Sequence, residues 1–257
     1  MDQNQKETEQ KRENVYSGKS EKTGVGGLVE TIIRKFRTVS YLLALAFLYF
    51  LILLAMGISA TPGVYLFMFA QDSTAAWPQF LHYLSIGCSI VFGYFFYGLS
   101  MIFVIPLFNF LMPFRVKPFR GSYFSLASVP WYFHNAFIYV VRYTFLEFFT
   151  PTPLNLLFYK MMGMKIGKHA HINTTNISDA ALIEIGDGVT IGGSATIFAH
   201  YASKGYLVVE PVKIKAGATI GIKATVMGDV EIGEGVIIAP HEVVMPKSRV
   251  FAVEKKD

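Results

Sequence analysis

The fold of the C-terminal third is decided by residues 212–247, VKIKAGATIGIKATVMGDVEIGEGVIIAPHEVVMPK, in which an aliphatic side chain returns at every sixth position. The aliphatic positions of this run and of two upstream runs are Ile166 and Ile172, then Ile185, Ile191 and Ile197, then Ile214, Ile220, Val226, Ile232, Ile238 and Val244. A period this short is typical of a coil of short strands that stack their aliphatic residues inward. Glycine and other small residues between them suit tight corners. We therefore predict a left-handed parallel β-helix of about four turns over residues 164–248.

The repeat is interrupted between its second and third runs. A full triangular turn needs 18 residues, whereas Ile214 follows Ile185 by 29. The extra 11 residues fall within FAHYASKGYLVVEPV, residues 198–212, and we expect them to leave the coil at a corner. Gly205 and Pro211 suit such an excursion. The first turn carries one further extra residue, near residues 174–176.

The half of the chain before the repeat is strongly apolar. Hydrophobic residues make up 53% of the sequence and charged residues only 16%, against about 25% in soluble domains. Two stretches, residues 41–59 (continuing over 64–70) and 83–114, are each long enough to cross a bilayer. Pro62 is expected to end or kink the first. The alternative is a pair of buried helices in a soluble fold, although no polar face interrupts either stretch.

Basic residues flank the two stretches at their outer ends only. Arg34, Lys35 and Arg37 precede the first and Arg115, Lys117 and Arg120 follow the second, while the connection between the two lacks Lys and Arg. This distribution predicts a transmembrane hairpin in the cytoplasmic (inner) membrane, with both ends and the β-helix in the cytoplasm.

The rest of the chain divides around these two units. Residues 1–26 are polar and predict a disordered cytoplasmic tail, residues 27–120 the hairpin, residues 121–163 interfacial or connecting helices, and residues 249–257 a second tail. The segment from Trp131 is apolar but contains His134, Asn135 and Arg142. These polar groups favour a helix in the membrane interface over a third span. An odd number of spans would place the β-helix on the other side.

The net charge of +5 is modest, and the sequence has no long Lys/Arg run. The charge therefore favours contact with an anionic membrane face rather than a nucleic acid.

Residues 151–200, PTPLNLLFYKMMGMKIGKHAHINTTNISDAALIEIGDGVTIGGSATIFAH, resemble the hexapeptide-repeat acyltransferase superfamily. More closely, they resemble the C-terminal repeat modules of ε-poly-lysine synthetase and related peptide synthetases. The resemblance implies a membrane-bound acyltransferase that takes an acyl group from acetyl-CoA or another acyl-CoA and passes it to a hydroxyl or amine. It also implies a homotrimer, with sites between neighbouring coils and a histidine beside a protruding loop as the base.

His200 is the histidine that fits this role, because it ends a repeat and begins the excursion. Glu210 or Asp179 is expected to orient its imidazole, although a surface carboxylate is the more common role for each. The remaining repeat-domain histidines, His169, His171 and His241, are expected on the surface. The γ-class carbonic anhydrases share the fold and bind a metal through three histidines, two of them five positions apart. Position 205 here is Gly, so we predict no metal site.

The resemblance implies that coenzyme A lies along the later turns of the coil. Its amides would contact residues around Ala216, Gly217, Gly221, Lys223 and Ala224, with help from Lys215, and its phosphates would contact Lys247 and Arg249. These assignments fail if the donor is a carrier-protein thioester.

The first hypothesis is therefore a membrane-anchored O- or N-acetyltransferase acting on a lipid-linked or envelope-precursor acceptor. Two alternatives remain open: an amide-forming module of the peptide-synthetase type, and a membrane scaffold without catalysis.

Overall fold

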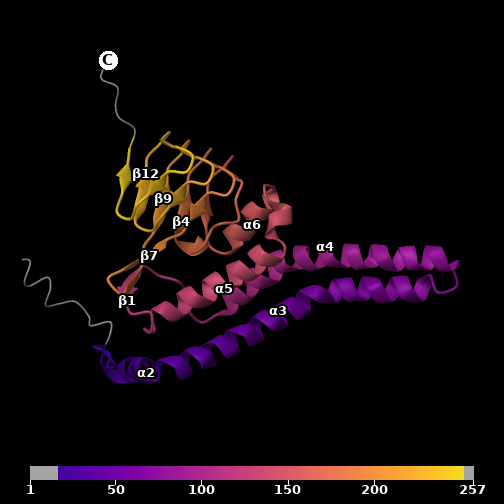
Figure 1. Ribbon diagram of the computed structural model, residues 1–257, viewed down its shortest axis with the longest axis horizontal. Coiled ribbons are helices and arrows are strands. Elements are labelled where there is room, and N and C mark those ends of the chain that lie inside the picture. The colour runs from indigo at the N-terminus through magenta and orange to yellow at the C-terminus, as the bar shows by residue number, and fades with distance from the viewer. Residues whose placement is uncertain (1–16, 252–257) are drawn as a thin grey trace, which may run out of the picture.

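The computed structural model describes residues 17–251 (Figure 1). A long helical hairpin comes first, followed by short connecting helices and a coil of short strands. The elements before the coil are α2 (Gly24–Lys35), α3 (Arg37–Ser73), α4 (Gln79–Leu111), β1 (Phe119–Gly121), α5 (Ser128–Thr144), η1 (Leu146–Phe149) and α6 (Pro153–Met161). The chain is thus a mixed protein with a helical N-terminal part and a β-structured C-terminal part.

Helices α3 and α4 form the hairpin, and both are long and apolar enough to cross a membrane by length and composition. Their backbones come close at Gly63 and Gly93, where a Cβ on Gly63 would lie 2.8 Å from the Gly93 carbonyl oxygen. Pro62 was expected to end or kink the first stretch. Helix α3 continues through Pro62, so Pro62 does not end the helix. In Figure 1 the half of the hairpin near its connecting turn stands apart from the rest of the chain.

Helix α5 lies between the hairpin and the coil (Figure 1). It buries Phe133, Phe137 and Val141 together with the polar residues His134 and Asn135. His134 and Asn135 therefore face protein, and the location of this helix in a membrane interface stays a prediction. The structure assigns only α3 and α4 as candidate spans within residues 17–251.

The coil is a parallel β-helix with three sheets that meet at corners. The first sheet contains β2 (Lys165–Ile166), β4 (Ile183–Ile185), β9 (Val212–Ile214), β12 (Val230–Ile232) and β15 (Arg249–Val250); the second contains β3 (His171–Ile172), β5 (Thr190–Ile191), β10 (Thr219–Ile220) and β13 (Ile237–Ile238); the third contains β6 (Thr196–Ile197), β11 (Thr225–Val226) and β14 (Val243–Val244).

The strand registers confirm the period of six. Ile185 pairs with Ile214, Ile214 with Ile232, and Ile191 with Ile220, and each of these side chains is buried in the coil. An isolated bridge from Ile177 to Ile197 completes the first turn of the third sheet. The coil therefore has about four turns, as predicted, while its left-handedness stays a prediction.

The extra residues form a β-hairpin, which confirms the predicted excursion. Strands β7 (His200–Ser203) and β8 (Tyr206–Val209) pair antiparallel, and β1 adds to the free edge of β8. Lys204 and Gly205 both have positive φ, as a two-residue hairpin turn requires. The insertion thus links the coil to the segment that follows the hairpin of long helices.

The predicted tails fall mostly outside the described residues, which exclude 1–16 and 252–257. Within the described part, Ser20 and Lys22 bond to the buried carboxylate of Glu30 in α2, which also pairs with Arg34. At the other end, β15 extends the coil to Val250, beyond the predicted boundary.

Candidate active site

His200 lies at the third corner of the coil, where the chain leaves β6 and enters β7. Ala199 before it is fully buried, while the His200 side chain is 25% exposed. Its ring packs edge-on against Trp131 of α5, with ring centroids 5.1 Å apart. The ring centroid of Phe198 lies 5.2 Å from that of His200. The local sequence thus holds one face of the imidazole in protein and leaves part of the ring accessible.

Asp179 is the carboxylate that contacts His200. Its Oδ2 lies 2.6 Å from His200 Nδ1 and also accepts the Ala199 backbone N–H at 2.8 Å. The Asp179 side chain is 0% exposed, so the surface role favoured for it from sequence is wrong. Burial alone raises the pKa of Asp179, but hydrogen bonds from His200 and Asn135 outweigh burial, and the pKa lies below its ordinary value.

Asn135 holds Asp179 from the opposite side and was not identified from the sequence. Its Nδ2 donates to Asp179 Oδ1 at 2.6 Å, and its Oδ1 accepts the Asp179 backbone N–H at 2.7 Å. Asp179 has φ of 59°, a left-handed conformation that Asp tolerates better than most residues. One side chain of α5 therefore stabilises both the carboxylate and the backbone turn that presents it.

This arrangement determines the chemistry open to His200. An ionised Asp179 accepts hydrogen bonds only, so Nδ1 of His200 must carry the proton between them. The other ring nitrogen, Nε2, is then left with its lone pair and can accept a proton from a bound group. Asp179 and His200 thus resemble two members of a catalytic triad, the orienting carboxylate and the base. Within residues 17–251, no nucleophilic side chain hydrogen-bonds to His200.

A second histidine, His134, lies beside this pair but is closed to solvent. Its Nδ1 lies 3.1 Å from Asn109 Oδ1 of α4, and its Nε2 accepts the Ala181 backbone N–H at 3.4 Å. Burial lowers the pKa of His134 to about 4, despite the opposing effect of the Asp179 charge. His134 is therefore neutral at neutral pH and ties α4 and α5 to the coil.

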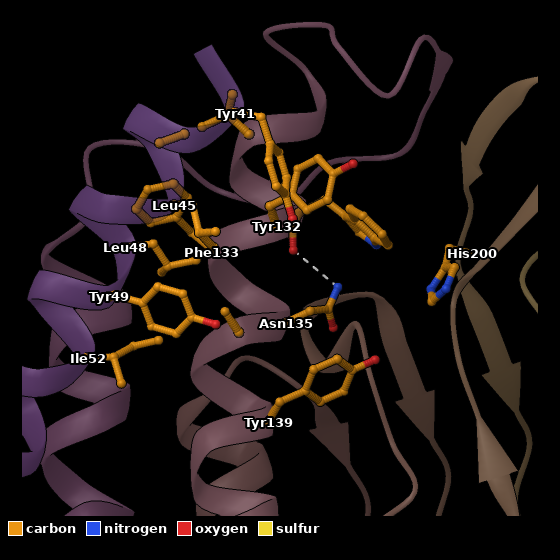
Figure 2. A pocket seen from close by; sticks show the side chains of 14 residues that line it. Tyr41, Leu45, Leu48, Tyr49, Ile52, Tyr132, Phe133, Asn135, Tyr139 and His200 are labelled. Atoms are coloured by element: carbon orange, nitrogen blue, oxygen red, sulfur yellow. Dashed lines mark hydrogen bonds between the residues drawn. The ribbon is translucent and has the colours of Figure 1, made fainter. Parts of the chain in front are cut away.

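A pocket of about 350 Å³ opens beside His200, between α3 and α5. Figure 2 shows Leu45, Leu48 and Ile52 of α3 on one side of it and His200 of the coil on the other. Asn135 and Tyr139 of α5 lie between them (Figure 2). The pocket is thus largely apolar, with Asn135 and His200 toward the coil and the hydroxyl-bearing Tyr49 on the α3 side.

The structure does not bring Glu210 to His200. The Glu210 backbone N–H donates to the Ala199 carbonyl at 2.8 Å and closes the base of the inserted hairpin. Burial, together with the nearby charge of Asp229, raises the pKa of the Glu210 carboxyl. Of the two carboxylates considered from sequence, only Asp179 orients the imidazole in this geometry.

The residues expected to contact coenzyme A lie on three different corners of the coil. Ala216 and Gly217 follow β9 at the first corner; Gly221, Lys223 and Ala224 lie at the second, between β10 and β11; Lys247 and Arg249 flank the third. Only the third corner also carries His200. These residues therefore do not form one surface within a single chain, and their role stays a prediction.

The basic residues of these corners are partly engaged already. Arg249 Nη2 bonds to Asp229 Oδ1 at 2.7 Å, and Lys215 Nζ lies 3.4 Å from Glu231 Oε1. The Lys247 backbone N–H donates to the Asp229 carbonyl at 2.9 Å, and its side chain is exposed. Lys247 is thus the cation best placed at the His200 corner for a phosphate.

His169, His171 and His241 are exposed, as predicted. Within residues 17–251 there is no group of three or more His, Cys, Asp or Glu side chains that could hold a metal ion.

Comparison with known families identifies the repeat. Residues 211–241 match the family model of the bacterial transferase hexapeptide (six repeats). A comparison with curated proteins gives no match, so the closer likeness to ε-poly-lysine synthetase modules stays a hypothesis.

Three solved structures illustrate the similarity. A hexapeptide-repeat-containing acetyltransferase from Vibrio cholerae is 28% identical, with 35% of this chain and 54% of that chain covered and a TM-score of 0.32. Serine acetyltransferase from Neisseria gonorrhoeae is 18% identical, with 48% and 51% covered and a TM-score of 0.28. Serine acetyltransferase isoform 3 from Entamoeba histolytica is 15% identical, with 99% and 93% covered and a TM-score of 0.22. The chain spans about half the length of the first two.

Proposed function

We propose that this member of the hexapeptide-repeat acyltransferase superfamily is a membrane-anchored acyltransferase with His200 as its general base. The donor is a coenzyme A thioester such as acetyl-CoA, and the acceptor is a hydroxyl or amine on a membrane-associated molecule. The observation that carries the proposal is the Asp179–His200 pair, buried on the carboxylate side and open on the pocket side.

The proposed reaction uses this pair as follows. Nε2 of His200 takes the proton of the acceptor hydroxyl or amine while the acceptor oxygen or nitrogen bonds to the thioester carbonyl carbon. The C–S bond then breaks, and the imidazolium returns the proton to the departing thiolate. Asp179 stays ionised throughout and stabilises the positive charge on the ring. The products are an ester or amide and the free thiol of coenzyme A.

Anchoring in the membrane is supported by the hairpin. Beyond Ile52, helix α3 continues for roughly 20 residues, or ~30 Å, which matches the hydrocarbon core of a bilayer. Apolar side chains such as Leu53, Ile58 and Phe69 are exposed there. Exposed apolar side chains over this length favour a lipid environment, because water would otherwise contact them.

A variant series tests the proposed function. Full-length protein in lipid nanodiscs is given acetyl-CoA and a membrane lipid extract from the source cells, and free thiol and acetylated lipid are measured. We expect His200→Ala to lower the rate by about 10²–10⁴-fold, the usual contribution of a general base. Asp179→Asn should also lower it, because the imidazole loses its charged partner.

An exposed histidine of the same coil provides the matched control. His171 lies in β3 of the second sheet, away from the His200 corner and from the residues expected to contact coenzyme A, so His171→Ala should leave the rate unchanged. An active His200→Ala protein would overturn the assignment of His200. A wild-type protein that folds and inserts but transfers no acyl group would favour a membrane scaffold.

A further inference from the structure

The distribution of apolar and polar side chains around the pocket beside His200 indicates the kind of ligand it binds. Leu45, Leu48 and Ile52 of α3 form one wall, and Phe133 and Ala136 of α5 form the other. His200 lines the pocket at the coil end with Asn135 of α5 on the same side, and Tyr49 adds a hydroxyl on the α3 side (Figure 2). A pocket of about 350 Å³ is at the small end of the ~300–1,000 Å³ typical of ligand sites. It therefore suits one slender apolar segment with a polar end.

The position of the pocket along α3 relates it to the membrane. All α3 residues that line it lie between Tyr41 and Ile52, in the first half of α3 and before the roughly 20 residues that the proposed function assigns to the hydrocarbon core. The basic residues Arg34, Lys35 and Arg37 lie just before it in the chain. If α3 crosses the bilayer as proposed, the pocket lies where hydrocarbon meets headgroups.

Aromatic side chains at the pocket support a position at the boundary between hydrocarbon and headgroups. Tyr41, Tyr49, Trp131, Tyr132 and Tyr139 all line it. Tyrosine and tryptophan concentrate at the boundary between hydrocarbon and headgroups, because their rings are apolar and their O–H or N–H groups are not. Tyr41 and Tyr49 are 48% and 55% exposed.

We propose that this pocket binds the hydrocarbon chain of the acceptor, so that the acceptor is a lipid or other single-chain amphiphile whose hydroxyl or amine reaches His200. The inference rests on the proposed function and deepens it. The chain lies between α3 and α5, and its polar end lies at Nε2.

The acceptor, rather than the acyl tail of the donor, is assigned to the pocket for a geometric reason. The base must contact the atom that gives up the proton, and that atom belongs to the acceptor. His200 is itself a lining residue, so the ligand end nearest it is the end that loses a proton. A soluble donor such as acetyl-CoA has no long apolar part that this pocket would accommodate.

The first experiment measures acceptor chain length in nanodiscs with acetyl-CoA as the donor. Straight-chain primary alcohols and amines of increasing length are used as acceptors. We expect kcat/KM to rise with chain length until the pocket is filled, because each buried methylene adds to binding. Equal transfer to short and long acceptors would overturn the proposal.

A pair of variants on α3 makes the test specific. Ala44 lines the pocket and is exposed, so Ala44→Phe should narrow the pocket without disturbing a packed core. Ala46 is also exposed, lies two positions further on and does not line the pocket, so Ala46→Phe is the matched control. We expect Ala44→Phe to lower kcat/KM for long-chain acceptors about tenfold or more and to leave the shortest acceptors unchanged. Ala46→Phe should behave as wild type.

A second arm varies the donor instead, with acetyl-CoA and palmitoyl-CoA compared on one short acceptor. If Ala44→Phe selectively slows palmitoyl transfer, the pocket holds the donor tail and the assignment to the acceptor is wrong. Identical behaviour of the Ala44 and Ala46 variants on every substrate would also overturn it.

Photo-crosslinking separates this proposal from the proposed function. A diazirine-bearing long-chain alcohol is irradiated with the protein in nanodiscs, and labelled peptides are mapped. Labelling of α3 and α5 around the pocket, reduced by Ala44→Phe but not by His200→Ala, supports the site even if no transfer is seen. Labelling confined to the outer surface of the hairpin would contradict the site, whatever the activity.

Discussion

At the residue scale, the main feature is that three donors from two separate segments, α5 and residues 199–200, meet at one carboxylate. Asp179 accepts hydrogen bonds from Asn135 on α5, from Ala199 at the end of the third sheet and from His200 at the start of the insertion. A buried carboxylate with several donors stays ionised and keeps a fixed orientation. Its neighbour His134 is different, because burial keeps its imidazole neutral while its ring nitrogens contact Asn109 and Ala181.

The stability of the protein should depend on pH through His134. Burial lowers the pKa of His134 to about 4, whereas the unfolded chain takes up its proton near pH 6.5. The unfolded state therefore binds more protons between these values, and the free energy of unfolding should fall as pH drops through this window. The expected loss is about 2 kcal/mol between pH 7 and pH 5.

Thermal unfolding in detergent at several pH values measures this dependence. His134→Gln keeps an acceptor for Ala181 but cannot titrate, so its stability should change less over the same window. Parallel pH profiles of the wild type and this variant would show that His134 does not control the effect. The pKa of Asp179 lies below its ordinary value, so its contribution is lost at lower pH, outside the window.

At the element scale, the corners of the coil are limited by backbone packing between successive turns. Gly192 follows β5, and a Cβ there would lie 2.8 Å from the Ile222 backbone nitrogen in the next turn. Gly193 beside it has more room, since its Cβ would come no closer than 3.6 Å, to Asn173 Nδ2. Close backbone packing thus excludes a side chain at Gly192 but not at Gly193.

A comparison of these two neighbours tests the packing argument. Gly192→Ala should destabilise the coil by about 1–3 kcal/mol, because backbone cannot move aside as a flexible side chain can. Gly193→Ala should be neutral or slightly stabilising, by up to about 1 kcal/mol, through the unfolded chain. Thermal unfolding of the two variants measures the difference. Equal melting temperatures would contradict the close approach at Gly192.

At the scale of the whole molecule, His200 and most of the residues expected to contact coenzyme A lie on different corners. Lys223 at the second corner and Ala216 at the first are separated from His200 by whole strands of the coil. Rotational symmetry places unlike corners of neighbouring coils against each other. We propose a homotrimer, in which the His200 corner of one chain faces another corner of the next.

Cross-linking in native membranes, combined with native mass spectrometry from nanodiscs, checks the oligomeric state. We expect three copies, and we expect acyl transfer to be lost when dilution in detergent separates them. A monomer that retains full transfer would contradict the shared site. It would also confine donor binding to residues near Lys247 at the third corner.

The period-six pattern was sufficient to predict the coil, its number of turns and the excursion at residues 198–212, because each aliphatic position has the same environment in every turn. The same regularity limits what it can say about the site. A hexapeptide looks alike on all three faces, so the pattern alone did not show which corner carries the site. Likewise, residue spacing identified His200 but left Asp179 and Glu210 as equal candidates.

The sequence by itself thus determined the β-helix, the apolar hairpin and the histidine at the break in register, since these depend on local periodicity and composition. Only the tertiary structure decided that His200 pairs with a buried Asp179 and that Asn135 hydrogen-bonds to Asp179. Asn135 lies 44 positions before Asp179, on a helix whose polar residues resemble those of an interfacial helix. The partner that satisfies a buried carboxylate is set by packing between α5 and the coil, and no local pattern in the sequence encodes that contact.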